Sequence, residues 1–91
     1  MIERVVLLKL GDVSRRAALA EEARRVLPAV PGVRSVTVGV PADADAEVWD
    51  LYFVLRFDRP EDVAAWTADP LHLGFADPEV KVRKAWSFLT D

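Results

Sequence analysis

The residues best suited to chemistry lie at positions 66–75, which read WTADPLHLGF and hold the only histidine of the chain. Asp-Pro is a favourable helix start, because the carboxylate accepts a backbone N–H and proline lacks the N–H that would otherwise be unpaired. If Asp69 caps a helix, His72 lies in its first turn, where the helix dipole favours the neutral imidazole and the Asp69 carboxylate opposes it. A neutral imidazole can act as a general base. His72 is therefore a candidate base, and the alternative is a histidine that only packs at a helix end.

The composition predicts one small domain, residues 1–91, with more apolar material than such a chain easily buries. The sequence is 52% hydrophobic and includes three tryptophans and four phenylalanines. A chain of this length buries only about 60–65% of its unfolded surface. We therefore expect a partner chain.

Charge and composition exclude several classes of site and partner. With no cysteine and one histidine, disulfides are excluded and the ligands of a structural zinc site are missing. The net charge of −3 includes no basic block, so we expect no nucleic-acid partner. The apolar runs are too short to span a membrane, and the N-terminus lacks the layout of a signal peptide. We therefore expect a cytoplasmic protein with no membrane partner.

Hydrophobic periodicity predicts four strands and two helices. The strands are rich in β-branched, aliphatic and aromatic side chains and comprise residues 2–10, 33–40, 48–57 and 82–89. The first helix is capped by Ser14 and stopped by Pro31-Gly32, and the second begins with the acidic residues around Pro60.

The resulting order, β-α-β-β-α-β, is the ferredoxin-like arrangement of the α+β class, an antiparallel four-stranded sheet with both helices on one face. Residues 2–10 and 48–57 carry apolar side chains on both parities, which is typical of strands covered on both faces. Two helices cover one face only. The pattern therefore predicts a homodimer in which the sheets of two copies pack face to face.

Four short motifs follow one another in the order and spacing of a known family. They are MIERVVLLKL at residues 1–10, LP and PGV within 27–33, FD and ED within 57–62, and PLHLGF at 70–75. With these motifs, nearly the whole chain resembles the stress-responsive dimeric α/β-barrel (Dabb) family. The resemblance implies the fold and the homodimer predicted above, closed into an α/β barrel, with a small apolar pocket between sheet and helices.

The resemblance also implies a chemistry. Known members include polyketide cyclases, which close rings by aldol-type reactions without cofactor or metal, and a plant hydroxynitrile lyase has the same fold. The cyclases use the His of their Pro-x-His-x-x-Phe motif as base, so the resemblance implies that His72 is the base and that no cofactor is needed. Trp66 stands where a tyrosine hydrogen-bonds the base or the substrate carbonyl. Arg4 replaces a first-strand histidine and could bind an enolate, carboxylate or phenolate through a bidentate contact. Asp69 and Leu51 replace two further histidines.

The candidate catalytic residues are thus His72, Arg4 and Trp66, and the expected ligand is a small apolar or phenolic molecule. The expected substrate-binding residues form an apolar wall: Val6, Leu8, Phe53, Phe75, Trp86 and Phe88. The first hypothesis is a cofactor-independent cyclase or lyase acting on a small aromatic or polyketide-like substrate, in which His72 removes a proton α to a carbonyl. The alternatives are a non-catalytic, small-molecule-binding or stress-related homodimer, and a monooxygenase or haem-related dimeric barrel.

Overall fold

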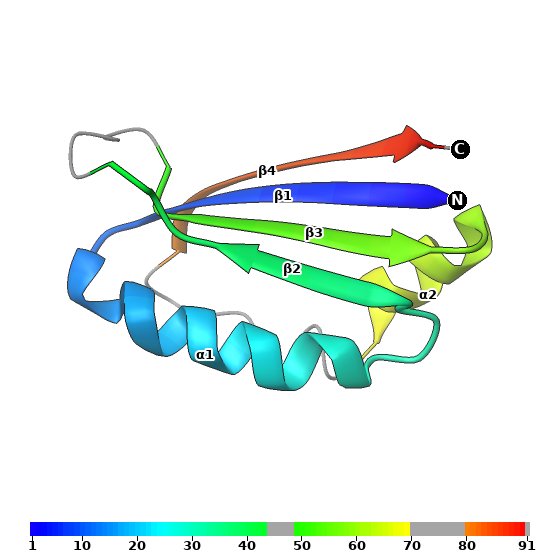
Figure 1. Ribbon diagram of the computed structural model, residues 1–91, viewed down its shortest axis with the longest axis horizontal. Coiled ribbons are helices and arrows are strands. Elements are labelled where there is room, and N and C mark those ends of the chain that lie inside the picture. Colours follow the sequence, from blue (N-terminus) through cyan, green and yellow to red (C-terminus); the bar gives the residue numbers. More distant parts are fainter. Residues whose placement is uncertain (44–48, 70–79, 91) are drawn as a thin grey trace.

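The computed structural model describes residues 1–43, 49–69 and 80–90, and these follow the predicted order of elements (Figure 1). The elements are β1 (Ile2–Leu10), α1 (Arg16–Val26), β2 (Ser35–Gly39), β3 (Leu51–Phe57), α2 (Pro60–Ala68) and β4 (Val80–Leu89). Short 3₁₀ turns, Val13–Arg15 and Leu27–Ala29, flank α1.

The first helix differs from its prediction at both ends. Ser14 does not cap α1; its N–H donates to Asp12 Oδ1 at 3.0 Å, so that Asp12 starts a 3₁₀ turn instead. Regular α-helix ends at Val26, because Pro28 has no N–H with which to continue the hydrogen-bond ladder. Gly32 then adopts a φ of 90°, which residues other than glycine rarely adopt, and the chain turns toward β2.

The strands form one sheet in the order β2-β3-β1-β4, and all neighbours are antiparallel. β1 lies between β3 and β4, so that Val5 pairs with Val54 on one side and with Trp86 on the other. Because successive side chains of a strand point to opposite faces, this register assigns the strand residues to faces. The ferredoxin-like α+β fold predicted from the sequence is confirmed.

Both helices lie on the same side of the sheet, here called the helix-covered face (Figure 1). The core fills the space between the two layers. Val6 and Leu55 enter it from the sheet, and Leu19, Ala23 and Trp66 enter it from the helices. Each of these side chains is at most 3% exposed. Since full burial of a large apolar side chain contributes about 1.5–3 kcal/mol, this core fixes both helices on the sheet.

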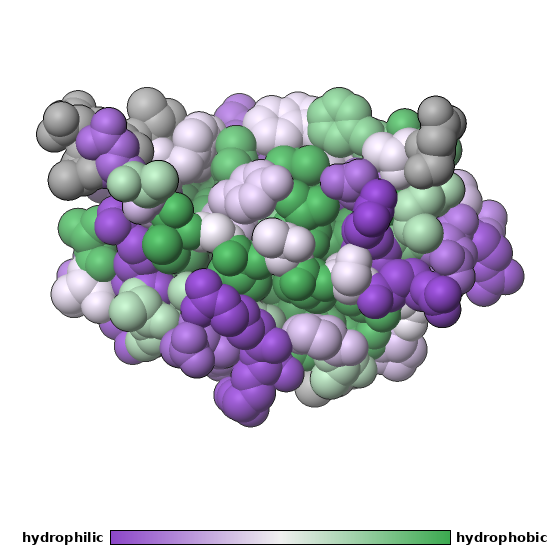
Figure 2. All heavy atoms as spheres, in the orientation of Figure 1, coloured by the Kyte–Doolittle hydropathy of each residue, from purple (hydrophilic) through white to green (hydrophobic). Residues whose placement is uncertain are grey.

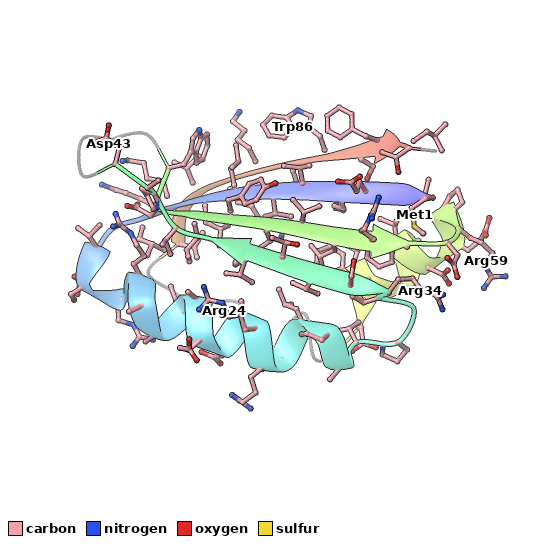
Figure 3. All side chains as sticks on the ribbon, in the orientation of Figure 1. Met1, Arg24, Arg34, Asp43, Arg59 and Trp86 are labelled. Carbon is pink, nitrogen blue, oxygen red and sulfur yellow. The ribbon has the colours of Figure 1, made fainter. Side chains whose placement is uncertain are left out.

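The side of the sheet turned away from the helices, here called the far face, also carries apolar side chains. Val54 lies near its centre and is 7% exposed, whereas Tyr52, Trp86 and Phe88 are 40%, 46% and 53% exposed. Figure 3 shows Trp86 on the side away from α1. Hydrophilic side chains gather instead over α1, as Figure 2 shows. The central strands are therefore apolar on both sides, as the sequence predicted.

Candidate functional site

Arg4 places a cation on the helix-covered face. Its neighbours in the sheet are Leu55 on β3 and Ser87 on β4. Arg4 Nη1 donates a hydrogen bond to Ser87 Oγ at 2.9 Å. The guanidinium carbon lies 6.0 Å from the centroid of the Trp66 ring, within reach of a cation–π contact. A strand and a helix thus hold the guanidinium from two sides.

Trp66 is held rigidly enough to position this cation. Its side chain is 2% exposed, and its ring lies 5.9 Å from that of Phe57 at an interplanar angle of 60°. Such tilted pairs are favourable for aromatic rings. The helix that carries Trp66 begins with Pro60, which fits the first helical turn, followed by Glu61 and Asp62 near the positive end of the dipole. Local sequence therefore starts α2, and ring packing fixes Trp66.

The surroundings of Arg4 strengthen its pull on an anion. Burial, and then the positive charge of Arg83, lower the pKa of Arg4 from its ordinary value. An arginine nevertheless stays protonated at neutral pH, so the group is a partly desolvated cation. Arg4 Nε is buried and has no hydrogen-bond partner among the residues that the structure describes, which is rare for a buried donor. A cation with an unused donor in such a place attracts a developing oxyanion more strongly than one in water.

The structure divides the predicted apolar wall between two faces. Val6, Leu8 and Phe53 are buried on the helix-covered face, at 3%, 4% and 3% exposure. Trp86 pairs with Val5, and Phe88 pairs with Glu3, which places both aromatic rings on the far face. Within one chain, these five residues do not form a single wall. The prediction grouped them by hydrophobicity, whereas the pairing of β4 with β1 decides the face.

Two predicted residues, His72 and Phe75, lie outside the described part of the chain. Asp69, the predicted cap of their helix, follows α2 directly and has an extended backbone, with φ −68° and ψ 136°. Of the predicted catalytic residues, the structure therefore brings together Arg4 and Trp66.

Sequence reasoning missed Ser87 and Arg83, which act on Arg4. A signal was present in the alternation of β4, where Arg83, Ala85 and Ser87 are small or polar while Trp86 and Phe88 are aromatic. Without the register, however, nothing in the sequence links that polar parity to the first strand.

Residues 1–43, 49–69 and 80–90 offer neither a metal-binding cluster nor a helix suited to a membrane span. No group of three or more His, Cys, Asp or Glu side chains in these ranges could hold a metal ion. No helix in them is long and apolar enough to cross a membrane.

The family model described as the stress responsive A/B barrel domain, Dabb, matches residues 2–87. The chain belongs to the Dabb family. The resemblance drawn from its short motifs is thereby confirmed. A search of curated proteins finds no significant match to this Dabb protein.

Solved structures show the same fold. A Dabb family protein from Mesorhizobium loti is 19% identical with a TM-score of 0.82, and the match covers 98% of this chain and 95% of that one. A dimeric ferredoxin-like protein of unknown function from Thermobifida fusca is 19% identical with a TM-score of 0.80, covering 98% and 90%. The hydroxynitrile lyase from Passiflora edulis is 11% identical with a TM-score of 0.78, covering 99% and 93%. At these identities the likeness establishes the fold alone.

Proposed function

We propose that this Dabb protein is a cofactor-independent cyclase or lyase that acts on a small aromatic or polyketide-like substrate, with His72 as the general base. One observation carries the proposal. Ser87 and Trp66 hold the guanidinium of Arg4 on the helix-covered face, and its Nε–H has no hydrogen-bond partner among the described residues. Enolate chemistry needs such a fixed cation, because negative charge develops on the carbonyl oxygen when the α carbon loses its proton.

The proposed reaction begins with proton transfer. His72 takes the proton from the carbon next to a carbonyl, and the electron pair of that C–H bond moves to the carbonyl oxygen. Arg4 donates hydrogen bonds to this oxyanion, and the Trp66 ring keeps the guanidinium in place. In a cyclase the enolate carbon then attacks a second carbonyl of the same molecule, and the new alkoxide takes up the proton that His72 holds.

The comparison with known structures supports this choice of reaction class. The Passiflora edulis protein is a hydroxynitrile lyase with the same fold. Lyase and aldol reactions of this kind both make or break a bond at a carbon that carries an oxygen. The charge on that oxygen changes during the step. A positioned base and a positioned cation serve both classes.

A homodimer belongs to the proposal. On the far face, Tyr52, Trp86 and Phe88 are each at least 40% exposed. Together they form an apolar patch, rather than the single scattered side chains that are normal on a surface. The Thermobifida fusca protein of the same fold is described as dimeric. We expect two copies to join through this face, with their sheets facing each other.

The second candidate is a homodimer that binds a small molecule without turning it over. The observation that favours it is the identity of Arg4 itself. A guanidinium does not exchange protons at neutral pH, so this position supplies binding and charge rather than acid–base catalysis.

Deuterium exchange separates the two candidates. In D₂O, the wild-type protein should accelerate exchange of the methyl protons of acetophenone, followed by proton NMR, and His72→Gln should lower that rate by about 10²–10⁴-fold. Arg4→Gln should also lower it, since the enolate loses its cation. Wild-type exchange no faster than that of the His72→Gln protein would leave only the binding function.

A further inference from the structure

β4 presents a second cation to the helix-covered face. Ser87 reaches this face, because its hydroxyl bonds to Arg4, and Ala85 reaches it too, because it packs against the core. Arg83 occupies the next position of the same parity and pairs with Leu8 as Ser87 pairs with Arg4. Alternation along the strand therefore places Arg83 and Arg4 on one face, with the small Ala85 between their positions.

These two arginines differ from most others in the described residues, which have acidic partners. Ion pairs are formed by Arg16 with Asp50, Arg24 with Glu21, Arg34 with Asp58, Arg56 with Glu3, and Arg59 with Glu61 and Asp62. Within residues 1–43, 49–69 and 80–90, neither Arg4 nor Arg83 pairs with a carboxylate. Burial and, after it, the like charge of Arg83 lower the pKa of Arg4. Among the described residues, the pair is a local excess of positive charge with no carboxylate partner.

The donors left over on Arg4 suit a carboxylate. Nη1 donates to Ser87, while Nε is buried and has no hydrogen-bond partner in the described part of the chain. Nε–H and the nearer N–H of Nη2 point the same way along one edge of the guanidinium. That edge is the one that holds two carboxylate oxygens in a bidentate contact, and the second N–H of Nη2 lies outside it and stays available to the oxyanion of the proposed reaction.

The surroundings restrict the rest of the ligand. Beside Arg4, the helix-covered face carries the ring of Trp66 and, at the next positions of the same parity, the paired residues Val6 and Ala85. These groups attract an apolar or aromatic body rather than a sugar or a nucleotide. The two cations thus lie beside apolar side chains of the core.

We infer that Arg4 and Arg83 together bind the carboxylate of an organic acid whose remaining part is apolar or aromatic. The inference rests on the proposed function for the place of the site and narrows its substrate class to acids. Arg83, which no catalytic step requires, is then the residue that selects charged over neutral ligands.

Calorimetric titration with benzoate and with benzamide tests this inference. The two molecules have nearly the same shape and differ in charge, so the ratio of their affinities isolates the contribution of the carboxylate. The variants are Arg83→Gln and Arg4→Lys, and the control is Arg25→Gln, which removes the same charge from an exposed position on α1. Arg83 is itself exposed, so its replacement should leave the fold intact.

The wild-type protein and Arg25→Gln should bind benzoate at least about tenfold more tightly than benzamide, the size of one charge-assisted hydrogen bond. Arg83→Gln should reduce that ratio several-fold without weakening benzamide. Arg4→Lys should weaken benzoate, because an ammonium group cannot form the bidentate contact. Added salt should weaken benzoate only.

Equal affinities for benzoate and benzamide, no heat from either, or an unchanged ratio in Arg83→Gln would overturn the inference. The proposed reaction is judged separately, since acetophenone carries no carboxylate. Loss of acetophenone exchange with retained benzoate preference would reject the reaction and keep the anion site, and the reverse result would do the opposite.

Discussion

Asp50 accepts a hydrogen bond from Arg16 Nη2 at 2.7 Å, and this ion pair ties the beginning of α1 to the residue before β3. Asp50 also accepts the N–H of Leu10 at 2.8 Å and donates its own N–H to the carbonyl of Leu8 at 2.8 Å. The residue is 7% exposed. One side chain thus joins β1, α1 and β3 at the end of the sheet where β1 finishes.

The pair predicts a dependence of stability on pH. Burial raises the pKa of Asp50, but the hydrogen bonds from Leu10 and Arg16 and the charges of Arg16 and Lys9 outweigh it, so the pKa lies below its ordinary value. A carboxyl with a lowered pKa in the folded state stabilises the protein above its unfolded pKa of about 3.9, and this contribution is lost as the pH falls through the folded value.

Asp50→Asn should therefore lower the free energy of unfolding by about 1–3 kcal/mol at neutral pH, and the difference from wild type should shrink below about pH 4. Thermal melts from neutral to acidic pH measure both effects. Asp58→Asn is the matched control, because its pair with Arg34 is long, 3.6 Å, and exposed on both sides, so it should change stability by less than about 1 kcal/mol. A difference that persists undiminished in acid would contradict the linkage.

Val54→Asp should break the dimer. Val54 lies near the centre of the far face and is 7% exposed, so a carboxylate there would be desolvated in the interface. Size-exclusion chromatography with light scattering should give about twice the chain mass of 10.1 kDa for wild type and a monomer or unfolded chain for the variant. Ala18→Asp is the control, since Ala18 is exposed on α1, on the side of the sheet opposite to the far face. A monomeric wild type at micromolar concentration would reject the dimer.

His72→Ala should separate a catalytic from a packing role. If His72 is the base, the melting temperature changes little while acetophenone exchange falls by about 10²–10⁴-fold. A packed imidazole would instead cost about 1–3 kcal/mol of stability, from a lost hydrogen bond and a small void. Calorimetry and NMR exchange on one variant give both numbers. A large loss of stability with the exchange rate intact would sink the catalytic assignment.

Ser87→Ala should loosen Arg4 without unfolding the protein. The hydrogen bond from Arg4 Nη1 lies at an exposed serine, so its loss should cost less than about 1 kcal/mol of stability. The freed guanidinium should still bind benzoate, but several-fold more weakly, because it must be ordered on binding. Ser87→Thr keeps the hydroxyl and should restore the affinity. An affinity unchanged in Ser87→Ala would show that Trp66 alone positions Arg4.

Sequence by itself determined the elements and the family. Alternation in β1 and β3 and the helical spacing of Leu19 and Ala23 are local patterns, and each reports burial within its own element. The observed ends of the elements differ from the predicted ones by a few residues. At Asp12, for example, a side-chain hydrogen bond begins a 3₁₀ turn ahead of α1. The apolar far face was predicted as well, because parity within a strand can be read without knowing its neighbours.

Tertiary structure alone decided which parity meets the helices and which charges meet each other. A one-residue change in the pairing of β4 with β1 would exchange Trp86 and Ser87 between faces, and no local pattern specifies that register. The bond between Arg4 and Ser87 spans 83 positions, and that between Arg16 and Asp50 spans 34. Such contacts depend on packing that the whole sheet creates, so the sequence indicates only a solvated helix residue at Arg16, and the fold makes it the partner of the buried Asp50.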